Sequence, residues 1–498
     1  IGIPWGIGPR APPLHVLPSM IMPGHPTNRW SLRRAVETVV SSLIALLLLV
    51  NWHVEWFLVN SGSMAQSLLG PHQAVTCSDC RYDFVCGSDP QAMAAKRVIC
   101  PNCGQTGEAL DAAAPTSGDR LLVHKAAYAL RGPRRWEVAA FRCPHDPKTV
   151  CVKRVVGLPG ELIEIKGGDI YADGVIQRKT LAQQRTLAVG VHNDNFRPRQ
   201  STLPARWQGE NAGTAWRLSA RGYVLDPPEH GLPAGGNHID WLTYRHLQRV
   251  PGRSAAVREA PITDAYGYNQ TRPVTQSFQV RDLLLAARLQ SAGEGSLALA
   301  ANDGRQRFLV LVQPALRRGT ILHNGAVLAE LNDLDWPQGQ PAHVELSLVD
   351  QQFMLALDGA CLFSHPYQTT GPANTRAAST AGSSWGDDEP RRPLGIGARG
   401  LALEAWDIRV LRDVYYTPIR QAGGADPPVQ YRLGPDEYLV LGDNSPQSDD
   451  SRTWPSVPGV RAELLLGKPF FVHFPSRLVC GRGVCFQVPD PARIRYIH

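Results

Sequence analysis

The sequence predicts a mostly β protein built from two or more domains. The chain has 498 residues, whereas a single hydrophobic core usually stops growing at about 250 to 300 residues. Helix-friendly runs are few, and short apolar stretches alternate with turn residues, among them 46 glycines and 41 prolines. The formal net charge of +7 is mild. No dense Lys/Arg stripe interleaved with aromatic residues is present, so nucleic acid is not an expected partner.

Residues 35–58 hold the one candidate membrane helix, and residues 1–34 are expected to be a cytoplasmic tail. The apolar run Val39–Val50 is short for a span of about 20 residues, which leaves a buried or interfacial helix as the alternative. Arginines precede the run, and the first 34 residues contain no Asp or Glu, so we expect the N-terminus inside. No A-x-A-like site follows, which disfavours a cleaved signal peptide. The chain starts at Ile1 rather than Met, which leaves open a start further upstream.

Four cysteines within residues 75–106 are spaced like the ligands of a zinc ribbon. Cys77-Ser78-Asp79-Cys80 and Cys100-Pro101-Asn102-Cys103 form two C-x-x-C knuckles with nineteen residues between them. Four thiolates complete a tetrahedron and leave no open position, so the expected zinc is structural and not catalytic. A pair of disulfides is the alternative outside the cytoplasm. Cys86 does not fit the spacing.

The remaining chain reads as a β body interrupted by a second β domain. Residues 59–204 and 415–498 carry short strands, such as those on either side of the Ala172-Asp173-Gly174 turn, and form the two parts of the body. Residues 205–414 alternate strands with turns such as Asn302-Asp303-Gly304, which predicts an inserted antiparallel sandwich. Its last strands resemble those of a concanavalin-like or laminin-G-like jelly roll. Trp207, Trp216 and Trp241 are candidates either for a glycan or protein ligand site or for the core.

Three segments together indicate a serine-lysine hydrolase. Ser61-Gly62-Ser63-Met64 sets a serine among small residues, and Lys153 lies in a valine-rich β-like stretch. A lysine can deprotonate a serine only when burial lowers its pKa. Its neighbour Arg154 is expected to point outward from the opposite face of the strand. The third segment is a polar turn that begins at Gly442-Asp443-Asn444. Ser63 is not followed by a lysine at the S-x-x-K spacing of penicillin-binding proteins. His53 and His124 have no evident partner for a Ser-His-Asp triad.

These segments, in this order, resemble bacterial signal peptidase I over about 130 residues. The resemblance implies Ser63 as nucleophile and Lys153, in the K-R-x-V-G-L-P-G box, as general base. It implies that Ser61 and the backbone N–H of Ser63 bind the oxyanion, and that Ser448 orients the lysine amine. Three further residues would support the site by ion pairing: Asp443, Asp450 and Arg452. Two positions depart from the family pattern: Gln66-Ser67 replaces the usual Pro-Thr, and Ser445 replaces the usual Arg.

The resemblance implies a membrane-bound serine endopeptidase that removes signal peptides from preproteins through an acyl-enzyme, without a catalytic cofactor. The catalytic body would face the periplasm or the exterior and contact membrane lipid. The alternative is a carbohydrate- or protein-binding module on a degenerate peptidase scaffold, motivated by the two departures. The sequence leaves open a disulfide between Cys480 and Cys485, and buried thiols at Cys143, Cys151 and Cys361.

Overall fold

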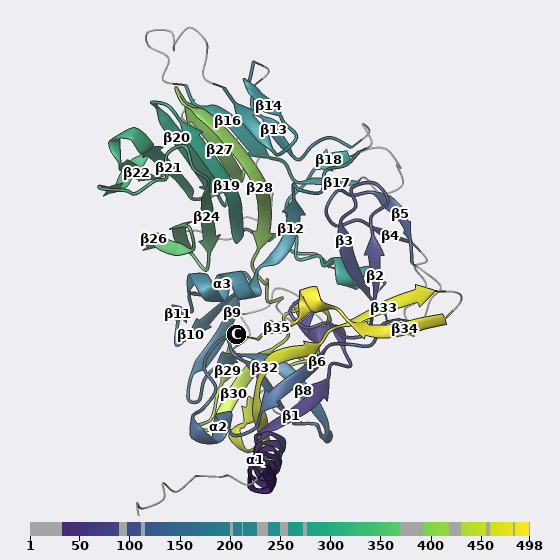
Figure 1. Cartoon of the computed structure of the whole chain (residues 1–498). Coiled ribbons are helices and arrows are strands. Elements are labelled where there is room, and N and C mark those ends of the chain that lie inside the picture. Colours follow the sequence, from purple (N-terminus) through teal and green to yellow (C-terminus); the bar gives the residue numbers. More distant parts are fainter. Residues whose placement is uncertain are drawn as a thin grey trace, which may run out of the picture. The chain divides into compact units, whose positions relative to one another are not determined.

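The structure of the protein is a computed structural model (Figure 1). It describes residues 32–88, 97–110, 115–199, 203–211, 213–226, 238–249, 257–271, 276–368, 392–417, 430–454, 459–481 and 484–497. Contacts divide the chain into two compact units, Ile1–Trp52 and His53–His498. Strands dominate the described residues, which confirms the prediction of a mostly β fold.

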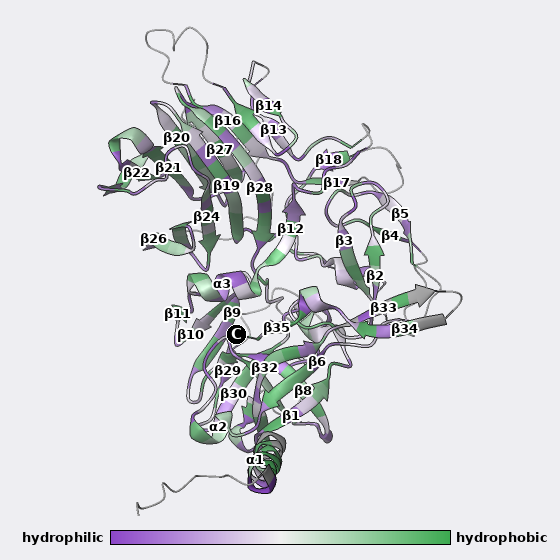
Figure 2. Cartoon of the chain, viewed as in Figure 1, coloured by the Kyte–Doolittle hydropathy of each residue, from purple (hydrophilic) through white to green (hydrophobic). Residues whose placement is uncertain are grey.

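The N-terminal helix differs from the expectation for residues 35–58. Helix α1 covers Leu32–His53, and hydrophobic residues dominate its described part (Figure 2). Residues Val54–Leu58 form strand β1 instead, because each of them pairs with strand β6 (Arg120–His124). Within the described residues, no helix combines the length and the apolar character needed to cross a bilayer. Of the expected tail 1–34, residues 1–31 lie outside the described part of the chain.

The body is built around one large antiparallel sheet. Among the described residues its strand order is β1-β6-β32-β7-β8-β30-β31, with β35 paired to β32. The bounds of the strands not yet given are β7 Val138–Cys143, β8 Asp146–Gly157, β30 Glu437–Leu441, β31 Gly459–Arg461, β32 Leu465–Phe474 and β35 Arg495–Tyr496. A disulfide joins Cys143 and Cys151 across β7 and β8. The sheet therefore unites segments from both ends of the sequence.

A smaller sheet and several short elements complete the body. The smaller sheet has the order β11-β10-β9-β29 among the described residues. Its strands are β9 Leu162–Lys166, β10 Asp169–Ala172, β11 Val175–Ile176 and β29 Gln430–Arg432. The short helices are α2 Ala127–Leu130 and α3 Leu181–Leu187, and β33 Ser476–Gly481 pairs with β34 Val484–Pro489. Cys480 and Cys485 face each other in the register of that hairpin.

The cysteine-rich segment folds as two hairpins. Strand β2 (His72–Thr76) pairs with β3 (Asp83–Gly87), and β4 (Arg97–Ile99) pairs with β5 (Thr106–Ala109). Backbone hydrogen bonds close both knuckles: Cys77 N donates to Tyr82 O, and Cys100 N donates to Gln105 O. Each C-x-x-C pair thus sits at the tip of a hairpin.

Residues within the predicted insertion form two antiparallel sheets packed on one core. One sheet has the order β14-β15-β28-β19-β24-β25-β26, with β12 paired to β28, and the other has the order β13-β16-β27-β20-β21-β22-β23. Leu285 and Val344 from the first sheet and Leu299 and Ile396 from the second share the core cluster. The strand bounds are β12 Val189–Asn193, β13 Trp207–Gly209, β14 Trp216–Leu218, β15 Tyr223–Leu225, β16 Asp240–Tyr244, β19 Leu283–Ala292, β20 Ser296–Asn302, β21 Arg307–Gln313, β22 Arg318–His323, β23 Ala326–Leu331, β24 Ala342–Val349, β25 Gln352–Leu357, β26 Ala360–Pro366, β27 Leu394–Arg399 and β28 Ala402–Arg412. A further hairpin pairs β17 (Leu247–Arg249) with β18 (Val257–Glu259).

The sandwich is joined to the body through buried polar contacts and an added strand. Strand β12, which precedes residue 205, pairs with β28. Lys179 Nζ, just before α3, donates hydrogen bonds of 2.7 Å to both Asp350 and Asp413 of the sandwich region. Trp207, Trp216 and Trp241 are all buried, so these tryptophans belong to the packed interior and are not an exposed ligand platform.

Candidate active site

The candidate nucleophile lies in a tight turn directly after β1. Gly62–Met64 form a short 3-10 helix, η1, in which the Ser63 side chain is buried. The carbonyl oxygen of Ser63 accepts a hydrogen bond of 3.0 Å from the backbone N–H of Asn444. Ser61 is exposed, and its Oγ lies 3.2 Å from Ser63 Oγ. The turn therefore presents two hydroxyl groups side by side, one buried and one open to solvent.

Lys153 reaches the serine from the centre of β8. Its Nζ lies 2.6 Å from Ser63 Oγ, and the lysine side chain is buried. Burial lowers the pKa of Lys153 to about 8, although the nearby carboxylates of Asp450 and Asp449 act in the opposite direction. A substantial fraction of the amine is therefore neutral near physiological pH and able to accept a proton.

The expectation that Arg154 points outward is wrong. Arg154 does leave β8 on the other face from Lys153, but its side chain is only 1% exposed. It donates two hydrogen bonds, of 2.8 and 2.6 Å, to the two carboxylate oxygens of Asp443, and a third to the backbone carbonyl of Trp136. Both faces of β8 are covered at this point, so the charge is compensated inside the protein and not by solvent.

The polar turn after β30 brings Asp450 and Arg452 to the same region. Arg452 pairs with Asp450 at 2.7 Å, and both side chains are almost fully buried. Burial alone would raise the pKa of Asp450, but the charge of Arg452 lowers it below its usual value. Arg452 Nη1 also donates to Ser445 Oγ at 2.6 Å. Ser445, one of the two departures from the family pattern, thus contributes a contact to this network.

Ser448 does not make the contact implied by the resemblance. Its Oγ is buried and has no hydrogen-bond partner among the described atoms, so it does not bond the Lys153 amine in this structure. The residue nevertheless lies close to the serine turn. A Cβ added at Gly442 would come within 2.2 Å of Ser448 Oγ and 2.4 Å of Ser63 O. Only glycine fits there, because Ser448 Oγ and Ser63 O occupy the space that a side chain at position 442 would need.

Two further features contact the turn and carry no local sequence signal of that role. Asn444 Nδ2 donates to the carbonyl of Gly62 at 2.9 Å, in addition to the backbone contact with Ser63. From the sandwich region, Tyr266 OH donates to the carbonyl of Asp443 at 2.6 Å. Asn444 lies inside the Gly442-Asp443-Asn444 motif, whereas Tyr266 is far from every motif in the sequence.

A cavity of about 890 Å³ is lined in part by Ala65–Leu69, which directly follow the serine motif. Its walls also include the cysteine hairpins, at Tyr82–Val85 and Ile99–Pro101, and Ala265–Gly267 of the sandwich region. Ser63 and Lys153 are not among its lining residues, whereas Arg154, on the other face of β8, is. The cavity therefore adjoins the segment that follows the candidate nucleophile, and chain segments outside the body form part of its wall.

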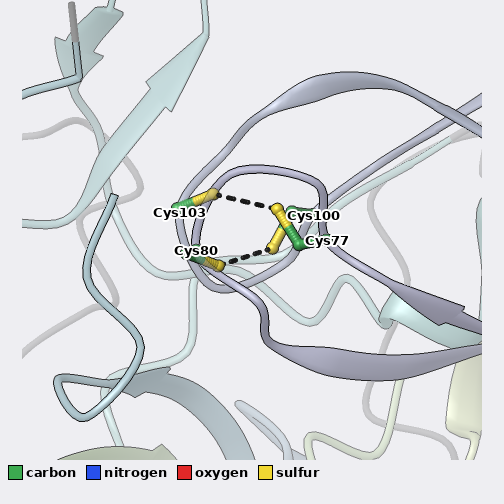
Figure 3. Close-up of side chains that lie close together, drawn as sticks. All are labelled: Cys77, Cys80, Cys100 and Cys103. Atoms are coloured by element: carbon green, nitrogen blue, oxygen red, sulfur yellow. Dashed lines mark hydrogen bonds between the residues drawn. The ribbon is translucent and has the colours of Figure 1, made fainter. Parts of the chain in front are cut away.

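The four motif cysteines form a compact cluster (Figure 3). All four are buried free thiols, and their sulfurs lie within 4.8 Å of one another. The distances Cys77 Sγ to Cys103 Sγ and Cys80 Sγ to Cys100 Sγ are both 3.7 Å. Two sulfurs bound to one tetrahedral zinc at about 2.3 Å lie about 3.8 Å apart, whereas disulfide sulfurs lie about 2.0 Å apart. The donor set and its spacing fit zinc.

Comparisons with known proteins match part of this chain to signal peptidases. Residues 106–210 match the family described as signal peptidase, peptidase S26. This region of the chain is similar to signal peptidases. Signal peptidase I of Pseudomonas fluorescens is 28% identical over 131 residues, which are 22% of this chain and 44% of that protein. Signal peptidase I V of Bacillus subtilis (strain 168) is 34% identical over 76 residues, 15% of this chain and 44% of that protein. The resemblance predicted from the sequence is confirmed.

The signal peptidase region accounts for part of the chain. The chain spans less than half the length of these curated relatives. The family match includes Lys153 but ends before the Gly442–Arg452 turn and begins after Ser63. Among solved structures, a carbohydrate-binding module, CBM66 of Bacillus subtilis, covers 42% of this chain and 93% of its own, at 12% identity and a TM-score of 0.21. A similarity at that level identifies neither a shared fold nor a ligand.

Proposed function

We propose that this protein is a serine endopeptidase of the signal peptidase I type, which removes signal peptides from preproteins. The observation that carries the proposal is the 2.6 Å contact between Lys153 Nζ and Ser63 Oγ. A buried lysine with a pKa of about 8, in contact with a serine hydroxyl, is the arrangement that a serine-lysine mechanism requires. The signal peptidase region that surrounds Lys153 supports the same conclusion.

The reaction would proceed in two balanced halves. The neutral Lys153 amine takes the proton from Ser63 Oγ, which attacks the scissile carbonyl. The negative charge on the carbonyl oxygen is stabilised by the Ser63 N–H and the Ser61 hydroxyl. The Lys153 ammonium then protonates the leaving amine, and an acyl-enzyme on Ser63 remains. Lys153 next takes a proton from a water molecule, which attacks the ester carbonyl, and the Lys153 ammonium returns that proton to Ser63 Oγ as the acyl–oxygen bond breaks, which restores both residues.

The cavity beside Ala65–Leu69, the segment that follows Ser63, is proposed to bind part of the substrate chain, although neither Ser63 nor Lys153 lines it. Its volume of about 890 Å³ is sufficient for several residues of an extended peptide, bound by strand-like hydrogen bonds. Small side chains are expected at the first and third positions before the cut, as the family resemblance implies. The walls supplied by the cysteine hairpins and the sandwich region restrict which chains can enter.

The four-cysteine cluster is proposed to hold a structural zinc ion. The residues that would bind it are Cys77, Cys80, Cys100 and Cys103, and the ion would fix the two hairpins relative to each other. Glu108 accepts hydrogen bonds from the backbone N–H and the hydroxyl of Ser78, inside the first knuckle. Such outer contacts orient the ligand-bearing loop. All four ligand positions would be taken by protein, so zinc has no part in bond cleavage.

The catalytic body is proposed to work outside the cytoplasm, at a membrane surface. The disulfide between Cys143 and Cys151 is typical of an oxidising compartment. Helix α1 exposes apolar side chains, among them Val39, Leu43 and Ile44, each at least half exposed, and such surfaces mark membrane or protein contacts. Leu43→Asp together with Ile44→Asp should reduce co-flotation of the full chain with phosphatidylglycerol vesicles. Undiminished flotation would contradict a role for α1 in membrane contact.

The test of the peptidase assignment is processing of a preprotein with an A-x-A cleavage site. Ser63→Ala and Lys153→Ala should each reduce cleavage to background while leaving the chain folded. Full activity in either variant would contradict the assignment. Glycan binding by the wild type together with no turnover would instead favour the alternative, a binding module on a degenerate scaffold.

A further inference from the structure

A short segment of the sandwich region reaches the serine turn. The segment Tyr266–Thr271 lies between β18 and β19, and most of it forms a 3-10 helix, η2, at Gly267–Thr271. Tyr266, Tyr268 and Asn269 are buried. Because these residues come from the predicted insertion, no motif of the signal peptidase region accounts for them.

Asn269 forms a reciprocal pair with Asn444. Asn269 Nδ2 donates to Asn444 Oδ1 at 2.7 Å, and Asn444 Nδ2 donates to Asn269 Oδ1 at 2.8 Å. The second hydrogen of Asn444 Nδ2 remains for Gly62 O, at 2.9 Å. Asn269 thereby fixes which way the Asn444 carboxamide faces, because rotating it would place like groups opposite each other.

The contact with Gly62 O determines the direction of the Ser63 N–H. Gly62 C=O and Ser63 N–H belong to one planar trans peptide unit and point in opposite directions. Holding the carbonyl oxygen therefore aims the N–H. Asn444 also holds the next carbonyl, since its backbone N–H donates to Ser63 O at 3.0 Å. Both peptide units that flank Ser63 are thus fixed by Asn444.

Tyr268 restrains the same turn by packing. A Cβ added at Gly62 would come within 2.3 Å of the Tyr268 ring, and one added at Gly87 within 2.4 Å. The ring therefore lies between the serine turn and strand β3 of the cysteine hairpins. Its hydroxyl donates to the carbonyl of Pro71 at 3.0 Å. Glycine is required at position 62 because the tyrosine ring occupies the space of a side chain.

The segment is itself anchored on the cysteine hairpins. Gln270 exchanges two hydrogen bonds, of 2.7 and 2.8 Å, with the backbone of Ile99. Thr271 Oγ1 donates to the carbonyl of Gly87 at 2.7 Å. These contacts tie η2 to the cysteine hairpins, so Asn269 projects from a fixed position.

We propose that Asn269 is a positioning residue for the peptidase reaction, which holds Asn444 so that the Ser63 N–H faces the developing oxyanion. The inference rests on the proposed function and makes the sandwich region part of the active site. Removing an oxyanion donor outright costs about 100-fold to 1,000-fold in kcat. Without Asn269 the Ser63 N–H is still present and loses only its fixed orientation, so kcat should fall by less than this.

The test compares Asn269→Ala with Asn302→Ala in the full chain, using a peptide with an A-x-A site. Asn269→Ala should lower kcat about tenfold, with KM within about twofold and an unchanged pH midpoint, because the donor acts in the transition state and Lys153 is untouched. Asn302→Ala removes another buried asparagine of the sandwich region, whose Oδ1 accepts a hydrogen bond from Gly304 N, and should retain wild-type kcat. In an Asn444→Ala background, Asn269→Ala should have no further effect. Wild-type kcat in Asn269→Ala would overturn the proposal.

A second measurement does not depend on turnover. Hydrogen exchange of the backbone amides at residues 61–66 should be faster in Asn269→Ala than in the wild type and in Asn302→Ala. If Asn269→Ala fails to fold, Asn269→Asp retains the volume and the acceptor but loses the donor to Asn444, and should show the same change. Unchanged exchange would overturn the positioning role. If the wild type cleaves no peptide, the proposed function fails, while exchange still decides whether Asn269 orders the turn.

Discussion

Lys153 and Arg154 are consecutive residues of β8, and both are buried, yet their surroundings favour opposite charge states. Lys153 contacts the Ser63 hydroxyl, whereas Arg154 is bonded to both oxygens of Asp443. Burial lowers the pKa of Lys153 to about 8. Arg154, compensated by a carboxylate, keeps its charge. Two adjacent positions on opposite faces of β8 thus hold a proton acceptor and a permanent cation.

The first prediction is that activity rises with pH through the pKa of Lys153. Only the neutral amine accepts the Ser63 proton, so kcat/KM should increase about tenfold between pH 7 and pH 9, with a midpoint near 8. The Asp449 carboxylate raises the pKa of Lys153, so Asp449→Asn should move the midpoint to lower pH. The measurement is peptide cleavage from pH 6 to 10. A rate independent of pH between 7 and 9 would contradict Lys153 as the base.

The second prediction concerns the stability cost of the lowered lysine pKa. The pKa of Lys153 is about 8 in the folded chain against a usual 10.5, so between these values the unfolded chain binds more protons. The free energy of unfolding should therefore rise with pH over this window. Lys153→Met, which has no charge to bury, should be inactive but more stable than wild type at pH 7, by about 1 to 3 kcal/mol. Urea denaturation at pH 7 and pH 9.5 should show this advantage shrinking. If the stability of Lys153→Met relative to the wild type instead increased with pH, the lowered pKa of Lys153 would be refuted.

The sequence predicted the local chemistry better than the assembly of the site. Ser63 and Lys153 could be singled out because each lies in a short motif, and a valine-rich strand explains why the lysine is buried. Arg154 was expected outside because strand alternation predicts opposite faces but not whether the second face is covered. That cover comes from Asp443, almost 300 residues later, and no local pattern predicts such a pairing.

The contacts between the sandwich region and the candidate site could not be predicted from the sequence either. The strands of the sandwich were predictable from Asp-Gly turns and alternation. The sequence did not predict that Tyr266 and Asn269 bond to Asp443 and Asn444 of the polar turn, because a tyrosine and an asparagine in a loop are ordinary turn or core residues. Likewise, the apolar run at Val39–Val50 predicted a helix, but not that Val54–Leu58 would leave it to pair with β6.

The third prediction is that removing one partner of the Arg154–Asp443 pair lowers the free energy of unfolding more than replacing both partners by apolar residues. Asp443→Asn leaves a buried arginine without its counter-charge and should destabilise the protein by about 3 to 5 kcal/mol. Arg154→Met together with Asp443→Leu should cost less than Asp443→Asn alone. Glu463→Gln, which removes the partner of the exposed Arg461, should change stability by less than about 1 kcal/mol. Urea denaturation measures all three, and equal costs for the buried and the exposed pair would contradict this prediction.

The fourth prediction is that zinc holds the cysteine hairpins and, through them, the wall of the substrate cavity. The purified chain should contain about one zinc ion by elemental analysis, and Cys100→Ser should lose it. Cys86→Ser is the matched control, because Cys86 is also buried but bonds to the carbonyl of Gly267 and lies outside the cluster. Removing zinc with a chelator should lower the thermal midpoint, since the ion would link the two hairpins. It should also raise KM for the peptide more than it lowers kcat, because Tyr82–Val85 line the cavity while Lys153 and Ser63 lie in the body. Equal zinc content in Cys100→Ser and the wild type would rule out the four-cysteine site.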